Sequence, residues 1–255
     1  QLVDFEWIKA HIPRGVSITN ISDETSKIDL QGPLSFEVLR KALGIDATHL
    51  KYFEIDFFKY KNHDITISRT GYTGELGVEI YCHNKAVVEI WEALLAHPDV
   101  LPIGLGARDT LRLEVGLALY GHELNENITP FEAKLDRFVS LDTDFTGKAS
   151  VINAKNSPKK LLVALELESK RAAREGSKIL NKEGQEIGVV SSGSFAPSVG
   201  KAIALGYVKP EYDKKYCEAL KWLQRIKVKI PFADLMDQYF PIKNIIRRTH
   251  YPRFL

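Results

Sequence analysis

The sequence contains little cysteine, almost no excess charge and no long apolar run, and each shortage excludes a class of protein. Its two cysteines, Cys82 and Cys217, have neither a CxxC spacing nor the Cys/His spacing of a zinc site. A disulfide framework or zinc site is therefore not expected, and a reducing compartment is favoured. The 35 basic and 33 acidic residues leave a net charge of +2, which argues against nucleic acid as a partner.

Apolar runs fall short of the roughly 20 residues that a membrane helix requires, so no membrane partner is expected. The sequence also lacks GxSxG, P-loop, HExxH and GxGxxG motifs, and we expect no metal. What it does have is 44% hydrophobic residues in a chain of 255. That is enough to bury the core of one large domain or two ordinary ones.

The segment from 16 to 97 alternates between strand and helix patterns. Two short apolar runs flank the polar cluster at 22–24 and predict two strands, the second at 27–30. Further patterns predict a helix at 33–44 ending at Gly44, a hairpin at 56–71 turning at 62–64, and a helix at 84–97. The strand–helix–strand–strand–helix order between 27 and 97 predicts an α+β fold, with helices on one face of an antiparallel sheet.

The rest of the chain changes character. A glycine-rich loop leads into a helix near 107–115, and residues 122–140 are polar and indicate a connection. After the linker at 156–160, four apolar runs alternate with Gly/Ser turns. This pattern predicts an antiparallel β barrel or sandwich.

The stretch SRTGYTGELGVEIY, residues 68–81, combines three glycines with a carboxylate inside a strand. By the period of two, Glu79 and Tyr81 share one strand face. One interpretation places Glu79 on a solvent-exposed face of the sheet. The other places it against a ligand, because the glycine-rich turn allows a close approach beside Tyr72. A carboxylate matches a flat heterocycle that presents two adjacent N–H donors, as pterins and guanines do.

A second candidate is the pair Arg108 and Arg112, one helical turn apart. Like charges at this spacing disfavour an isolated helix, so the pair predicts negatively charged groups nearby, either from the fold or from a ligand. For Arg108, near the helix start, a ligand anion is one reading. Internal bridges are the other, and the carboxylates that could make them are Asp109, Glu114 and Glu123. His122 lacks a Cys or Ser partner and is interpreted as a hydrogen-bonded loop residue.

Four separated motifs, RTGYTGELGVEIY, PIGLGARDTLRLEVGLALYGHELNENITPFEA, DFTGKAS and GVVSSGSFAPSVGKAIALGYV, occur in order along the chain. From about Val16 to Val208 the chain thereby resembles the glycine cleavage system T-protein family, the aminomethyltransferases. The resemblance implies a cloverleaf-like, three-domain fold with tetrahydrofolate as co-substrate in a central channel. It also implies lipoylated H-protein as partner, and transfer of its aminomethyl carbon to tetrahydrofolate with release of ammonia.

Carried over motif by motif, the resemblance assigns three residues to the folate site. Glu79 would accept from the pterin N3 and 2-amino groups, Tyr72 would lie beside the ring, and Arg108 would meet the glutamyl carboxylate. The family's catalytic aspartate is expected before Gln1. Leu135–Arg137 departs from the family's LxW, and the tail after Phe232 has no counterpart.

The resemblance also suggests a division of the chain. Residues 1–22 would be the remnant of an N-terminal or middle domain, 23–121 the folate-binding α+β domain, and 122–155 a connection back to the middle domain. Residues 156–255 would form the C-terminal β-barrel domain with its unplaced tail. Localisation would be the bacterial cytoplasm, or the mitochondrial matrix in a eukaryote.

Two other readings stay open. One is a non-catalytic folate-binding module, or the detached folate domain of a dimethylglycine or sarcosine dehydrogenase-like enzyme, which an upstream flavin-binding GxGxxG would identify. The other is a tRNA-modification relative of the same fold. That group usually has a central cysteine where this chain reads GYTGE, so this reading is the weaker one.

Overall fold

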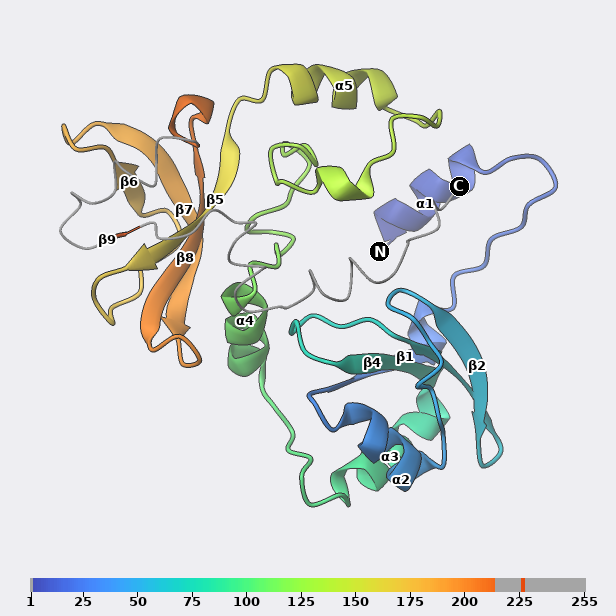
Figure 1. Ribbon diagram of the computed structural model, residues 1–255. Coiled ribbons are helices and arrows are strands. Elements are labelled where there is room, and N and C mark those ends of the chain that lie inside the picture. The colour runs from blue at the N-terminus through green and yellow to red at the C-terminus, as the bar shows by residue number, and fades with distance from the viewer. Residues whose placement is uncertain (1, 214–225, 228–255) are drawn as a thin grey trace. The chain divides into compact units, whose positions relative to one another are not determined.

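The computed structural model describes residues 2–213 and 226–227. The chain divides into two compact units (Figure 1). The first comprises residues 1–71 and 75–102, and the second comprises 72–74 and 103–255. The functional division at residues 22, 121 and 155 stays a prediction.

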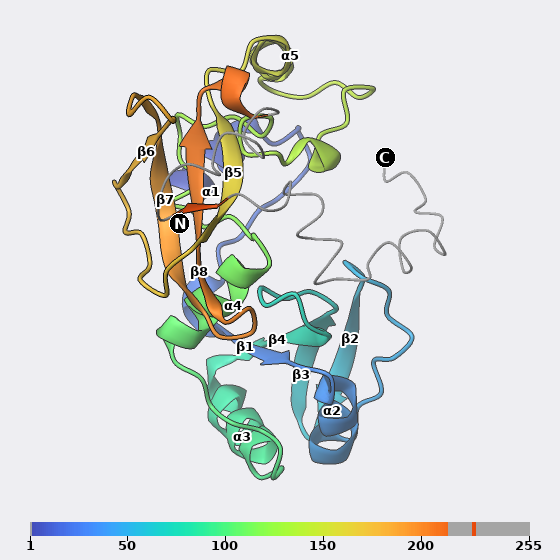
Figure 2. The same cartoon turned by 60° about the vertical axis from the view of Figure 1, so that its left-hand side comes forward.

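The first unit is built on a four-stranded antiparallel sheet with strand order β1-β4-β3-β2. The strands are β1 (Thr25–Gln31), β2 (Ile55–Tyr60), β3 (His63–Ser68) and β4 (Gly77–His83). Helices α2 (Ser35–Leu43) and α3 (Asn84–Leu95) lie on the same face of this sheet in both views (Figure 1, Figure 2). Helix α1 (Leu2–His11) and a 3-10 turn (Ser22–Glu24) precede it. The predicted α+β arrangement is confirmed.

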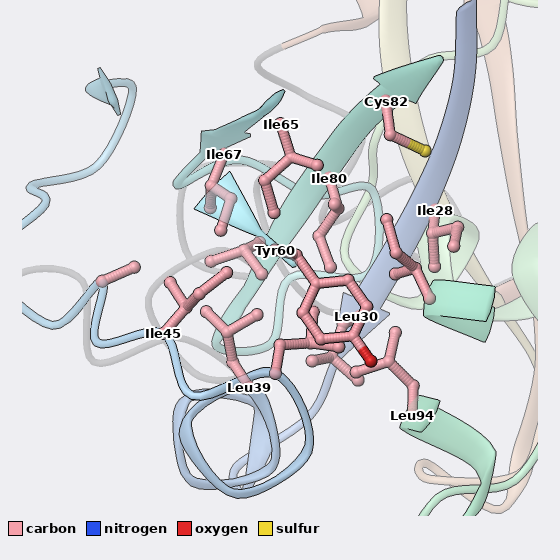
Figure 3. Close-up of a cluster of buried hydrophobic side chains, with 14 of the residues drawn as sticks. Ile28, Leu30, Leu39, Ile45, Tyr60, Ile65, Ile67, Ile80, Cys82 and Leu94 are labelled. Atoms are coloured by element: carbon pink, nitrogen blue, oxygen red, sulfur yellow. The ribbon is translucent and has the colours of Figure 1, made fainter. Parts of the chain in front are cut away.

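The core of this unit follows from the alternation of its strands (Figure 3). One face of each strand contributes apolar side chains, which pack against Leu39 of α2 and Ile90 and Leu94 of α3. Full burial of such a side chain stabilises the fold by about 1.5–3 kcal/mol. The strand side chains in this core include Ile28, Leu30, Ile65, Ile67, Val78 and Ile80. The opposite face of the two neighbouring strands β1 and β4 is therefore left to polar residues, among them Glu79.

Local features show where the sequence pattern was sufficient. Gly44 caps α2 with φ of 71°, as predicted. The hairpin turn consists of Lys61 and Asn62, one residue earlier than predicted, and Lys61 itself takes the positive φ of 52°. The predicted strand near Val16 is not formed, and its apolar residues are exposed (Val16 54%, Ile21 60%) because no described strand pairs with them. Strand β4 confirms the strand expected around Glu79, which the predicted strand–helix–strand–strand–helix order did not include.

The second unit contains a five-stranded antiparallel sheet with order β6-β7-β8-β5-β9. Its elements are α4 (Leu105–Glu114), α5 (Lys148–Asn156), β5 (Leu161–Leu167), β6 (Lys178–Leu180), β7 (Glu186–Ala196), β8 (Lys201–Val208) and β9 (Ile226–Lys227), with 3-10 turns at Asp136–Phe138 and Pro210–Tyr212. The antiparallel prediction is confirmed. The described strands do not close into a barrel, because β6 and β9 are edges. The tail after Phe232 lies outside the described residues.

Both faces of this sheet are buried. Leu113 of α4 packs on one face, against Leu162, Leu205 and Tyr207. The other face carries a separate cluster that includes Val163, Ile179, Ile187, Val190 and Ala204. Helix α4 begins at Leu105, two residues before the predicted start, so Arg108 lies inside its first turn and its N–H donates to the Gly104 carbonyl.

Candidate ligand-binding residues

Glu79 lies on the polar face of the first unit and is held by three side chains. Its Oε1 accepts a hydrogen bond from Lys27 Nζ at 2.5 Å. Its Oε2 accepts from Thr70 Oγ1 at 2.6 Å and from Tyr81 OH at 3.1 Å. Only 14% of the side chain is exposed. The carboxylate is thus positioned and partly desolvated by strands β1 and β4, rather than being a freely solvated side chain on the sheet.

The protonation state of Glu79 follows from these contacts. Burial alone would raise the pKa of its carboxyl group. The hydrogen bonds from Lys27, Thr70 and Tyr81, together with the charge of Lys27, outweigh burial and lower the pKa below the ordinary value. Glu79 is therefore an anionic acceptor at neutral pH.

The glycines at the two ends of the loop 70–78 leave room for the side chain of Gln31. Its Nε2 donates to the carbonyl oxygens of Thr70 and Val78, each at 3.2 Å. A Cβ on Gly71 would lie 2.0 Å from Gln31 Oε1, and one on Gly77 would lie 2.5 Å from Gln31 Cδ. The glutamine amide therefore braces the loop from inside. From the sequence, these glycines were expected to make room for a ligand. The structure shows that they make room for the side chain of Gln31, which the sequence did not indicate.

Replacing Gly71 by alanine is expected to lower the free energy of unfolding of the first unit by about 1–2 kcal/mol, because Gln31 must leave and two hydrogen bonds are lost. Urea denaturation of Gly71→Ala, Gln31→Ala and the double variant measures the coupling. In the Gln31→Ala background the space is vacant, so the Gly71→Ala cost should shrink. If Gly71→Ala lowers the free energy of unfolding equally in both backgrounds, Gln31 is not the reason that residue 71 must be glycine.

Tyr72 and Arg108 lie together in the second unit. The Tyr72 hydroxyl donates to the Ala118 carbonyl at 2.6 Å, and burial raises the pKa of this phenol, which keeps it protonated. The Arg108 guanidinium carbon lies 5.1 Å from the centre of the Tyr72 ring, a cation–π contact. The structure thus brings these two predicted residues together, whereas Glu79 belongs to the first unit.

Arg112 is a buried structural residue, 1% exposed. Its Nε donates to Asp109 Oδ1 at 2.8 Å, its Nη1 to Glu123 Oε2 at 2.7 Å, and its Nη2 to Ser192 Oγ at 2.8 Å. The interpretation of internal bridges is confirmed for Asp109 and Glu123. It is wrong for Glu114, whose carboxylate instead accepts from the Ser198 N–H at 3.0 Å.

A β-bulge in β7 supplies two hydroxyl groups to this ion pair. The register with β8 shifts between Val190 and Ser192, so Ser191 is an extra residue. Ser191 Oγ donates to Glu123 Oε1 at 2.6 Å, while Ser192 Oγ accepts from Arg112. Consecutive serines could not both reach one side of a regular strand, and sequence reasoning did not foresee this.

His122 lies in a loop and makes two polar contacts. His122 Nδ1 lies 3.4 Å from the Ser191 carbonyl and 3.2 Å from a Glu175 oxygen, which agrees with a hydrogen-bonded loop residue. Within the described ranges, no group of three or more His, Cys, Asp or Glu side chains is arranged to hold a metal ion. No helix there is both long and apolar enough to cross a membrane.

The fold and these residues define a two-unit α+β protein: a helix-covered antiparallel sheet with a braced, glycine-rich loop, followed by an antiparallel β domain. Two family models match it. Residues 1–143 match the GCVT N-terminal domain, and residues 160–230 match the glycine cleavage T-protein C-terminal barrel domain. The chain belongs to the glycine cleavage T-protein family.

Known relatives support this membership. The aminomethyltransferase of Thermotoga neapolitana is 41% identical over 209 residues, which cover 80% of this chain and 57% of that protein. That of Natranaerobius thermophilus is 43% identical over 224 residues, 83% of this chain and 60% of that protein. The crystal structure of the glycine cleavage system aminomethyltransferase T from Bartonella henselae matches with a TM-score of 0.69 and 34% identity, over 74% of this chain and 53% of that chain.

The chain spans 57–60% of the length of these two aminomethyltransferase relatives.

Proposed function

We propose that this chain binds tetrahydrofolate and takes part in moving the lipoyl-bound aminomethyl carbon of H-protein to it, with release of ammonia. The observation that carries the proposal is the ionised, oriented carboxylate of Glu79 in a chain of the T-protein family. The relatives of Thermotoga and Natranaerobius are named aminomethyltransferases. Their names favour a transferase over a detached dehydrogenase domain.

For Glu79, the proposed role is to accept from the two adjacent N–H donors of the pterin ring. A carboxylate offers about four acceptor positions, and three intrachain donors use three of them. A ligand presenting two donors therefore takes the remaining position and displaces one intrachain donor. Lys27 is the donor best able to move, because 36% of its side chain is exposed.

For Tyr72 and Arg108, the proposed roles are apolar contact with the ring system and recognition of the glutamyl carboxylate. The Tyr72 ring is fixed at both ends, by its hydroxyl bond to Ala118 and by its backbone in the loop. A guanidinium resting on that ring presents a planar fork that fits a carboxylate. These residues bind and orient; no described residue is assigned as the catalytic acid.

Catalysis in this proposal depends mainly on positioning. Holding the accepting nitrogen of the folate against the reacting carbon replaces an encounter in solution by a bound geometry, which lowers the entropic part of the activation barrier. An anionic Glu79 contributes by fixing the orientation of the ring to which that nitrogen belongs. Lipoylated H-protein is the proposed donor partner, and the bacterial cytoplasm or the mitochondrial matrix is the proposed location.

The test is formation of 5,10-methylenetetrahydrofolate from aminomethyl-loaded H-protein, with a parallel calorimetric titration of tetrahydrofolate. Folate-dependent turnover supports the transferase. Because the catalytic aspartate is expected before Gln1, folate binding without turnover supports the alternative, a non-catalytic folate-binding module, only where a chain extended upstream of Gln1 also fails to turn over. Absence of both binding and turnover in a folded chain contradicts the proposal.

Replacing Arg108 by lysine is expected to weaken folates that carry a glutamyl tail about 10-fold more than a bare pterin. An ammonium keeps the charge but loses the bidentate geometry, and charge-assisted hydrogen bonds contribute about 1.5–3 kcal/mol each. Calorimetry with tetrahydrofolate and with a tailless tetrahydropterin measures the difference. Arg137→Lys, in the same unit, is the matched control. Equal losses for both ligands would mean that Arg108 supports the fold and not the tail.

A further inference from the structure

A hollow of about 660 Å³ lies in the second unit. Neither Arg108 nor Tyr72 lines it. One wall is the segment 170–177, and another is the end of β7 at Ser194 and Phe195. The lining includes three cations, Lys170, Arg171 and Arg174, and no carboxylate. Its volume falls within the range of small-molecule sites, about 300–1,000 Å³.

These three cations have no acidic partner within the part of the chain that the structure describes. Neighbouring cations do have partners, since Lys178 pairs with Glu186 at 2.9 Å and Lys201 pairs with Glu166. Like charges brought together repel one another, and a bound anion would relieve the repulsion. The hollow is therefore a concentration of uncompensated positive charge.

The wall that carries the cations is fixed against β7. Gly193 lets the carbonyl of Ala173 approach, because a Cβ there would lie 2.1 Å from that oxygen. Gly176 N–H donates to the Val190 carbonyl, and Val190 N–H donates to the Ser177 carbonyl, both at 2.9 Å. The Arg174 N–H donates to Ser177 Oγ at 3.2 Å. The backbone that presents Arg174 is thus positioned before any ligand binds.

We propose that this hollow binds a small polyanion, a compact molecule with two or more phosphate or carboxylate groups and an apolar or ring portion against Phe195. Arg171 and Arg174 supply planar forks that hold such oxygens in pairs, and Lys170 adds a point charge. Phe195 is 36% exposed and supplies an apolar surface. A hollow of this size favours a compact ligand over an acidic protein surface. The site is independent of the proposed folate function.

The experiment is calorimetric titration with two probes, tripolyphosphate for the phosphate source and citrate for the carboxylate source. The test variant is Arg171→Gln/Arg174→Gln. The charge-matched control is Lys182→Gln/Lys209→Gln, which removes two cations of the same unit that do not line the hollow. We expect the test variant to lose at least about 10-fold in affinity, since two charge-assisted contacts are removed, and the control to change less than about 2-fold.

Binding of either probe, with this pattern of affinity loss, supports the site. The probe that binds shows whether the ligand's anionic groups are phosphates or carboxylates. Arg171→Lys/Arg174→Lys should lose affinity too while melting like the parent, which separates ligand binding from folding. Four results would overturn the proposal, the first three of which concern the probes and variants. These three are no binding of either probe, equal losses in the test and control variants, or binding of an acidic peptide when both small anions fail. Competition by tetrahydrofolate would also overturn it, because the hollow would then belong to the folate site.

Discussion

Replacing Arg112 by methionine is expected to lower the free energy of unfolding of the second unit by about 3–5 kcal/mol. The guanidinium is 1% exposed and donates to carboxylates, a hydroxyl and the Leu117 carbonyl. Without it, the Glu123 carboxylate, itself 0% exposed, remains as a buried charge whose principal partner has gone. Breaking a buried pair in this way costs far more than the pair contributes when intact.

Urea denaturation combined with amide hydrogen exchange in β7 and β8 measures this effect within the second unit. Arg137→Met removes a cation near the surface turn at 136–138 and should change stability by less than about 0.5 kcal/mol. The double variant Arg112→Met/Glu123→Gln should recover part of the loss, because the buried charge is removed as well. A single Arg112→Met variant within 1 kcal/mol of the parent would show that water reaches Glu123, contrary to its burial.

Replacing Glu79 by glutamine is expected to weaken tetrahydrofolate binding by about 10- to 150-fold. The substitution removes the negative charge and puts an amide donor where the pterin also presents donors, a loss of about 1.5–3 kcal/mol. Calorimetric titration measures it. Glu89→Gln is the matched control, since Glu89 is a carboxylate of the same unit that pairs with Lys61 at the surface.

The same variant should also alter the pH dependence of stability. The pKa of Glu79 is lowered in the folded chain, so its ion pair stabilises the fold above the ordinary value of 4.5 and this contribution disappears as pH falls through the folded pKa. Glu79→Gln should therefore lose less stability than the parent between about pH 5 and pH 3. Unchanged folate affinity together with this flattened profile would leave Glu79 a purely structural residue.

Sequence periodicity was sufficient for most of the fold. The alternation of Val78, Ile80 and Cys82 with Glu79 and Tyr81 is visible in the sequence, and the structure buries the first three and leaves the other two on the polar face. It failed for the run at Val16, because an apolar run becomes a strand only when a partner strand is available.

The contacts of the candidate site could be predicted only in part. Asp109 is three residues from Arg112, so helical spacing indicated that bridge. From β1, Lys27 reaches Glu79 and Gln31 reaches the loop 70–78. Only the register of β1 with β4, set by tertiary packing, brings these side chains there. The pairing of Arg112 with Ser192 spans 80 residues and leaves no local signal.

The extra residue in β7 changes which residues of that strand share a face. Before it, Val189 pairs with Tyr207 on the α4 side, while Val190 pairs with Gly206 on the other side. After it, Ser192 pairs with Leu205 on the α4 side and Phe195 pairs with Ala202 on the other. A relative one residue shorter here would exchange these positions, turning the hydroxyl away from Arg112 and the phenyl ring away from the cationic hollow. An alignment that places its gap elsewhere in the strand would attribute both features to the wrong residues.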